Sequence, residues 1–376
     1  MTSGVHKKPG RKLTPPIARG ATPVPTGATT RPPPPDEATV AHGARNVVVR
    51  CLGVLPRETV HILCYRASAV APILARAVED AGAKPILIDV EPLEGDSASI
   101  GDYGAKLTPL LQGATATMLL APVRPPAAMS VAVAKTAEAQ RARHLHLLQV
   151  DERLLVTSVR ADPDLLAVVN ARVTSALAAP SVVRITSEAG TALEIHLDPR
   201  HPILSSSGRP SPGTSENLPA GHVYMHPYRV SGTLVCDRAI FGPKVEVDRQ
   251  RLRRTPLRAV FNGGRLGSFD TSDPDVRTVV ETYLASHVNA NRVGLAVFPT
   301  NYLVRSEIGS DRQDMLLPGL AISMGYASAE VTRAPYEAPV QMVMLGRRQT
   351  VEVGGRRIID AGRFDGALVD GIDPFR

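Results

Sequence analysis

Cysteine, tryptophan and long apolar runs are what this 376-residue sequence most clearly lacks. The three cysteines, Cys51, Cys64 and Cys236, are odd in number, far apart and without CxxC spacing. That usage argues against a disulfide framework and against a structural zinc site. No apolar run approaches the ~20 residues of a membrane-spanning helix, and no apolar stretch follows the basic N-terminal residues as a secretory signal requires. We therefore expect a cytoplasmic protein without a membrane span.

Aromatic residues are also scarce, with six Phe, eight Tyr and no Trp. The core must therefore be filled mainly by Ala, Val, Leu and Ile. The length is sufficient for two ordinary domains, each with its own core.

Positive charge exceeds negative charge by seven, which invites a nucleic-acid interpretation. The excess is concentrated at the start, because residues 1–45 carry seven Lys or Arg and only two acids. The rest of the chain is nearly neutral, unlike the basic groove or stripe of a nucleic-acid-binding domain. We therefore expect neither nucleic acid nor a membrane as a partner.

Residues 1–43 contain nine prolines, including the run 32–35, and no aromatic residue. Such a segment cannot bury enough apolar surface to offset the entropy of ordering it. The composition predicts a disordered, Pro-rich basic arm. It can be a linker-like extension or a docking arm for an acidic partner.

Residues 44–180 alternate between apolar β-rich runs and helical patterns. The alternation opens at 47–49, and its main strands are expected at 59–65, 85–90, 117–121 and 144–148. Helical patterns follow Ser68 and cover 129–140 and 163–178. Near-continuous apolar strands alternating with helices indicate a parallel sheet covered on both faces, a Rossmann-like α/β domain. The turn at 65–68 has no glycine and the GxGxxG and GxxxxGK[ST] motifs are absent, so no nucleotide cofactor is expected.

Residues 181–376 show a different pattern, which predicts an α+β domain with an antiparallel sheet. A hairpin is expected at 182–197 around Gly190, and a second at 351–359 around Gly354 and Gly355. Residues 199–221 are rich in Pro, Ser and Gly and predict a long loop. Further strands are expected at 222–235 and 243–248, and Asp273 before Pro274 predicts the start of a helix.

Histidines supply the first candidates for chemistry, since neither HExxH nor GxSxG occurs. His144 and His146 alternate on a predicted strand and should share one face, either as a ligand pair or as partly buried strand residues. His222 and His226 have the four-residue spacing of a helical zinc site, but the neighbouring Gly221 and Pro227 favour loop and strand instead.

The order of motifs in the second half resembles the M29 (aminopeptidase T) family and the iron-dependent dihydroxypyridine ring-cleaving dioxygenases that share its scaffold. The resemblance covers residues 46–365 and begins at the turn 55–58. Its motifs lie at 188–193, 217–224, 232–234, 291–294, 299–301, 321–325 and 339–341, and it closes at 362–364. It implies a two-domain scaffold and a homodimer.

The resemblance also implies where metal ligands would stand, and most of those positions carry no donor. A family Glu is replaced by His222, and a second Glu by Leu295. A family His is replaced by Ala321, and the final His-x-Asp becomes Pro339-Val340-Gln341. Because a divalent metal needs three or more converging donors, the resemblance implies a degenerate metal site.

A degenerate site on an intact scaffold suggests binding without catalysis. The chain is similar in this respect to peptide-binding proteins of crocagin-type ribosomal peptide natural-product pathways, a fold-level analogy. It implies a precursor peptide and its modifying enzymes as partners, with no catalytic residue, metal or cofactor. The alternative is a metal-dependent aminopeptidase or ring-cleaving dioxygenase with an atypical metal site. The candidate binding residues are His222, Tyr224, His226, Arg229, Leu295, Asn301, Ala321, Pro339 and Gln341.

Overall fold

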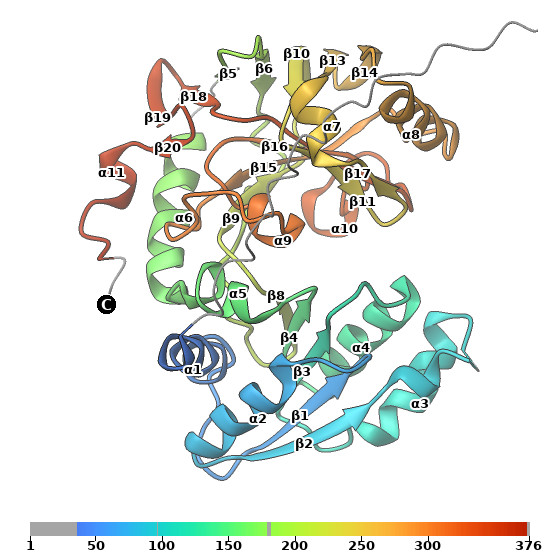
Figure 1. Ribbon diagram of the computed structural model, residues 1–376, viewed down its shortest axis with the longest axis vertical. Coiled ribbons are helices and arrows are strands. Elements are labelled where there is room, and N and C mark those ends of the chain that lie inside the picture. Colours follow the sequence, from blue (N-terminus) through green and yellow to red (C-terminus); the bar gives the residue numbers. More distant parts are fainter. Residues whose placement is uncertain (1–35, 96, 179–181, 374–376) are drawn as a thin grey trace, which may run out of the picture. The chain divides into compact units, whose positions relative to one another are not determined.

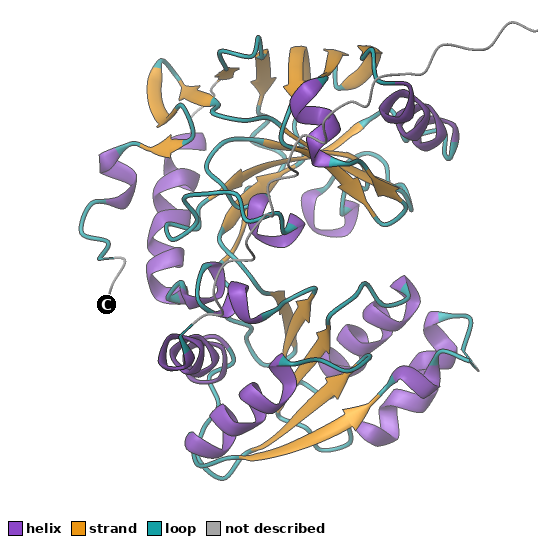
Figure 2. Cartoon of the chain, viewed as in Figure 1, coloured by secondary structure: helices purple, strands orange, loops and turns teal. Residues whose placement is uncertain are grey.

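A computed structural model describes residues 36–95, 97–178 and 182–373, and all of them belong to one compact unit (Figures 1 and 2). The part of the predicted arm at residues 1–35 lies outside the described residues. The predicted domain boundary at 180/181 stays a prediction. Among the described residues, no helix is both long enough and apolar enough to cross a membrane.

The first sheet, called sheet A, is parallel and has the strand order β2-β1-β3-β4-β8. Its strands are β1 Thr59–Cys64, β2 Lys84–Asp89, β3 Ala116–Ala121, β4 Arg143–Leu148 and β8 Thr214–Asn217. All six residues of β3 are buried, as expected for a strand covered on both faces. The predicted parallel sheet and its four apolar strands are confirmed.

The fifth strand of sheet A was not expected, since residues 199–221 were predicted to form a loop. This segment contains two short strands, β7 Leu204–Ser206 and β8. Strand β8 pairs in parallel with β4, so a segment well beyond residue 180 completes sheet A. Its sequence, Thr-Ser-Glu-Asn, has no apolar alternation, and only pairing with β4 makes it a strand.

Helices cover both faces of sheet A. On one face α2 Val70–Asp80 packs with α1 Glu37–Arg45 and the π-helix Asn46–Cys51, and on the other face lie α3 Ile100–Leu110 and α4 Ala127–Ala139 (Figure 1). The prediction of disorder up to residue 43 is therefore wrong for 37–43, and residues 47–49 are helical rather than a strand. Val40 and Ala44 bury one side of α1, and the Asp36 side chain accepts a hydrogen bond from Thr39 N at its start.

The second half contains two antiparallel sheets where one was predicted. Sheet B has the order β14-β13-β10-β6-β5-β18-β19-β20, and sheet C has the order β12-β11-β17-β16-β15-β9-β7. The strands of sheet B are β5 Val182–Thr186, β6 Ala192–His196, β10 Arg229–Cys236, β13 Leu257–Asn262, β14 Arg265–Asp270, β18 Thr350–Val353, β19 Arg356–Asp360 and β20 Arg363–Phe364. Those of sheet C, besides β7, are β9 His222–Met225, β11 Ala239–Gly242, β12 Val245–Glu246, β15 Val293–Pro299, β16 Ala321–Gly325 and β17 Gln341–Leu345.

Both sheets contribute side chains to one hydrophobic cluster, together with helices α6 Pro163–Leu177 and α8 Pro274–Ala285. Helix α8 begins as predicted, because Asp273 caps it by accepting hydrogen bonds from the backbone N–H of Asp275 and Val276 at 3.0 and 3.2 Å. The two predicted hairpins, β5–β6 and β18–β19, are confirmed. The remaining helices are α5 Glu152–Leu155, α7 Arg249–Arg254, α9 Asp311–Asp314, α10 Ala329–Thr332 and α11 Gly366–Val369, with short 3-10 turns at Glu91–Leu93 and Ser158–Arg160.

Candidate functional site

Sheet C has a second face, opposite the one that packs into the shared core. Along β15, Ala296 and Phe298 point into that core, so Leu295 and Val297 point the other way. These two belong to a separate hydrophobic cluster, which we call the outer cluster. Its buried members are Ala239, Phe241, Leu295, Val297, Ala321, Val343 and Leu345.

Strand register brings two predicted site positions together in the outer cluster. Val297 lies opposite Ala321 on β16 and opposite Tyr224 on β9, while Leu295 lies opposite Ser323. Ala321 is fully buried, and Leu295 keeps 7% of its surface exposed. The cluster is packed against Tyr224 and Met315. Apolar side chains thus fill the positions where the aminopeptidase T resemblance implied two of the metal ligands.

Polar side chains border the outer cluster at opposite ends. On β17, Gln341 donates a hydrogen bond from Nε2 to Ser323 Oγ at 3.0 Å. On β9, the ring of His222 lies 5.6 Å from that of Tyr224, and His222 Nδ1 is buried without a hydrogen-bond partner. Burial lowers the pKa of His222 to about 4, so this imidazole is neutral at physiological pH and can accept or donate a hydrogen bond.

Glu216 joins this polar margin although it is not among the predicted binding residues. It lies on β8, and its Oε2 accepts a hydrogen bond from Ser206 Oγ at 2.5 Å. Ser206 in turn lies opposite His222 in the β7–β9 pair. Burial raises the pKa of Glu216 to about 7. The pKa of Tyr224 is also raised, first by the burial of Tyr224 itself and then by the charge of Glu216. The only sequence signal was its position directly before the motif at 217–224.

Three predicted binding residues lie elsewhere. His226 lines a separate hollow of about 390 Å³ together with His201, and its Nδ1 is 2.8 Å from Gly294 O. Arg229 is exposed at the start of β10 in sheet B, and Pro339 is exposed in the loop before β17. The structure therefore does not bring these three side chains into the outer cluster.

Asn301, the remaining predicted binding residue, is fully buried and used for internal hydrogen bonds. Its Nδ2 donates to Ser158 O at 3.0 Å and to Ala220 O at 2.7 Å, and its Oδ1 accepts from Leu303 N at 3.2 Å. These bonds tie three separate stretches of backbone together. Both Nδ2 hydrogens and one lone pair of Oδ1 are used within the fold, which favours a structural role for Asn301.

A cleft of about 840 Å³ opens beside the outer cluster, at the edge of sheet A where β3 and β4 end. Its lining includes Pro122 and Gln149 from the segments after these strands, Phe241 of the outer cluster, and Arg249 and Arg312 from α7 and α9. Ligands of α/β proteins commonly bind in a crevice outside the carboxyl ends of parallel strands, where the strand-to-helix connections lie.

The predicted histidine pair lies on the strand that leads to this cleft. His144 and His146 share one face of β4, as predicted, with ring centroids 4.6 Å apart. His144 is fully buried and its Nδ1 is 2.6 Å from Thr117 Oγ1. Burial lowers the pKa of His146 to about 4, and the charge of Arg312 is a second, smaller cause of the shift. Both are neutral strand histidines, with His144 buried and His146 half-buried.

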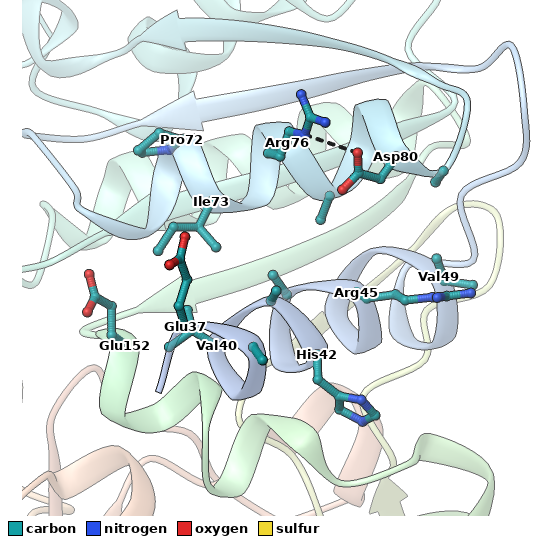
Figure 3. Close-up of a pocket in the computed structure, with 15 residues that line it drawn as sticks. Glu37, Val40, His42, Arg45, Val49, Pro72, Ile73, Arg76, Asp80 and Glu152 are labelled. Carbon is teal, nitrogen blue, oxygen red and sulfur yellow. Dashed lines mark ion pairs between the residues drawn. The ribbon is translucent and has the colours of Figure 1, made fainter. Parts of the chain in front are cut away.

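A further hollow of about 820 Å³ lies between α1 and α2 (Figure 3). Its floor is mainly apolar, with Val40 and Ile73 facing each other, and Arg76 pairs with Asp80 at its side. None of the predicted site residues lines it.

Comparison with known protein families shows which family this chain belongs to. Residues 42–241, more than half of the sequence, match NicX, 2,5-dihydroxypyridine 5,6-dioxygenase. The chain belongs to the NicX family. The comparison with curated protein sequences found no match.

Solved structures show the same fold as this member of the NicX family. A 2,5-dihydroxypyridine dioxygenase from Pseudomonas putida aligns with a TM-score of 0.64 at 14% identity, covering 88% of this chain and 98% of that one. Wild-type AmpT from Thermus thermophilus aligns with a TM-score of 0.57 at 16% identity, covering 87% and 99%. The predicted resemblance to the aminopeptidase T and dihydroxypyridine dioxygenase scaffold is confirmed.

The metal implied by this resemblance can be tested against the side chains present. Of the implied positions, Leu295 and Ala321 have no donor atom, Pro339 is exposed in a loop, and Gln341 is bonded to Ser323. Among the described residues, no group of three or more His, Cys, Asp or Glu side chains is placed to hold a metal ion. The residues on this face of sheet C therefore do not fit a divalent metal.

Proposed function

We propose that this member of the NicX family is a non-catalytic peptide-binding protein. It would hold a precursor peptide for modifying enzymes in a ribosomal peptide natural-product pathway. The observation that supports the proposal is the outer cluster, where apolar Leu295 and Ala321 occupy positions that the family resemblance assigns to metal ligands. Loss of those donors removes the means of metal-dependent chemistry, while the scaffold that shapes the cleft is retained.

The cleft beside the outer cluster suits an extended chain. Its volume of about 840 Å³ is within the range of about 300–1,000 Å³ typical of ligand pockets. It combines apolar surface from Phe241 with charged and amide side chains from Arg249, Arg312 and Gln149. Peptide recognition uses this combination, because side chains need apolar pockets while the peptide backbone needs hydrogen-bonding groups.

Titration calorimetry tests the proposal directly. Peptides encoded by short open reading frames beside the gene serve as the probes, and scrambled peptides of the same composition serve as controls. We expect one encoded peptide to bind with a micromolar or lower Kd, about −8 kcal/mol, and its scrambled form to bind at least tenfold more weakly. Failure of every encoded peptide to bind at tens of micromolar contradicts the proposal.

A metal-dependent enzyme with an atypical site is the second candidate, either an aminopeptidase or a ring-cleaving dioxygenase. Family membership favours it, and so does Glu216, because a carboxyl group with a pKa near 7 suits proton transfer at neutral pH. Turnover of aminoacyl-anilides or of 2,5-dihydroxypyridine by metal-supplemented protein would establish this candidate in place of the first.

We further propose that the protein is a homodimer, as its family resemblance implies. A specific dimer requires an interface above about 1,000 Å². Size-exclusion chromatography with light scattering at micromolar concentration should give twice the 40.0 kDa of one chain, and a monomer mass would contradict this part of the proposal.

A further inference from the structure

Arg312 is a cation that forms no ion pair in the cleft beside the outer cluster. It lines the cleft from α9, and its Nε is buried and has no hydrogen-bond partner. Burial, followed by the charge of Arg124, lowers the pKa of Arg312 to about 10, and the charge of Asp311 opposes this shift. Two like charges close together with one of them desolvated are unfavourable unless an anion joins them.

The residues on either side of Arg312 are firmly held. Arg249 forms ion pairs with both Asp311 and Asp314, and Asp314 also accepts hydrogen bonds from the N–H groups of Ile308 and Gly309 at 2.9 and 3.0 Å. Gln313 accepts one from Thr157 Oγ1 at 2.5 Å. The backbone on both sides of Arg312 is thus fixed, so its unpaired guanidinium belongs to an anchored turn.

The acids that line the cleft are already engaged elsewhere, with the exception of exposed Glu246. Asp311 pairs with Arg249, Asp151 pairs with Arg153 at 2.7 Å, and Asp248 caps α7 by accepting from the N–H of Gln250. None of them neutralises Arg312 through an ion pair.

One residue that lines the same cleft carries an unpaired acceptor. Gln149 follows β4 in a left-handed backbone conformation, with φ of 58°, and its buried Oε1 has no hydrogen-bond partner. A buried amide oxygen without a donor costs free energy comparable to a lost hydrogen bond. The cleft therefore offers one cationic donor, one neutral acceptor and the apolar side chains of Ile240 and Phe241.

We propose that this cleft binds the carboxyl-terminal residue of a peptide. The terminal carboxylate pairs with Arg312, the last backbone N–H donates to Gln149 Oε1, and an apolar terminal side chain packs against Phe241. An arginine fork and a carboxylate match geometrically, and charge-assisted hydrogen bonds are stronger than neutral ones. The identity of the ligand rests on the proposed peptide-binding function, whereas the anion site at Arg312 can be tested by itself.

Small anions test the site independently of any peptide. Sodium acetate at 100 mM, compared with sodium chloride at equal ionic strength, should raise the Tm of the wild type by about 2 °C and should not raise that of Arg312→Gln. Arg153→Gln, which removes an ion-paired arginine from the same cleft, should respond like the wild type. Equal responses of wild type and Arg312→Gln, or a larger response to phosphate than to acetate, would overturn the carboxylate site.

Peptide pools then test the ligand. Two N-acetylated random hexapeptide pools, one with free carboxyl termini and one amidated, are passed over immobilised wild type, Arg312→Gln and Arg153→Gln, and retained peptides are counted by mass spectrometry. We expect wild type and Arg153→Gln to retain at least tenfold more free-carboxyl than amidated peptide, with apolar terminal residues enriched, and Arg312→Gln to lose this preference.

The outcomes separate the two proposals. Peptide retention without any carboxyl preference, or a preference for internal Asp and Glu that survives amidation, overturns the terminal-carboxylate assignment while the peptide-binding function stands. An Arg312-dependent response to acetate with no retention of either pool overturns peptide as the ligand and leaves the carboxylate site in place. Arg312→Gln should fold at least as stably as the wild type, because it removes an unpaired buried charge.

Discussion

Ser206 Oγ donates a 2.5 Å hydrogen bond to Glu216 Oε2, and this bond joins β7 of sheet C to β8 of sheet A. Both strands come from the segment 199–221, so one short stretch of chain serves two sheets. The bond also places a half-buried carboxyl group next to His222 at the border of the outer cluster.

Glu216 should make stability depend on pH. Burial raises its pKa from 4.5 to about 7, so the folded state binds more protons than the unfolded state between these values. The contribution of Glu216 to the free energy of unfolding is therefore fully present below pH 4.5 and is lost as the pH rises through 7. The loss is on the order of 3 kcal/mol. Urea unfolding at pH 5 and pH 8 should show Glu216→Gln close to wild type at pH 5 and more stable than wild type at pH 8. An identical pH dependence of the two proteins would contradict the raised pKa.

Leu295 should be sensitive to charge if a peptide side chain lies against the outer cluster. Leu295→Glu places an unpaired carboxylate among apolar side chains and should weaken binding of the encoded peptide more than tenfold. Leu295→Met conserves volume and should change affinity by less than a factor of three. Calorimetry on variants with an intact circular dichroism spectrum gives the comparison, and unchanged affinity for folded Leu295→Glu would place the peptide elsewhere.

Asn301 should contribute to stability more than to binding. Asn301→Ala leaves Ser158 O and Ala220 O without their donor in a buried position, which should cost about 2–4 kcal/mol of unfolding free energy. Gln112→Ala removes an exposed amide and should cost less than about 0.5 kcal/mol. Urea unfolding followed by circular dichroism measures both, and equal effects of the two substitutions would argue against the structural role.

The scarcity of metal-binding side chains on the outer face of sheet C predicts that the purified protein contains little metal. Protein purified without a metal-binding tag should contain well under one equivalent of Zn, Fe or Mn by mass spectrometry. Chelators should leave its Tm unchanged, because a metal bound only to the folded state adds stability by mass action. Stoichiometric metal that disappears in His222→Ala would show that the site retains a ligand set after all.

Local sequence patterns predicted much of the fold. The apolar runs of β1 to β4 and the helices between them predicted the parallel sheet, because strands buried on both faces need continuous apolar sequence. The capping Asp273 and the glycine pair at 354 and 355 predicted α8 and the last hairpin, since caps and tight turns depend on neighbouring residues.

Prediction failed where distant contacts decide the structure. Residues 47–49 form a good β-pattern but are helical, because the segment continues α1 and buries Val47 and Val48 against the helices beside sheet A. Strand β8 has polar sequence and exists through its pairing with β4. Such cases follow from tertiary packing, which overrides weak local preference.

In the candidate site, too, the sequence predicted some features and tertiary contacts decided others. Motif order in the sequence placed His222, Tyr224, Leu295, Ala321 and Gln341 in one region, and strand register sets them on one face of sheet C. The sequence by itself determined the family scaffold and the apolar identity of Leu295 and Ala321, because both depend on residue identity at known spacings. Tertiary structure alone decided that Asn301 is buried and bonded within the fold, that Glu216 lies half-buried beside Ser206, and that Arg312 forms no ion pair in a cleft. These properties depend on which groups far apart in sequence become neighbours and exclude water, and residue identity does not specify that.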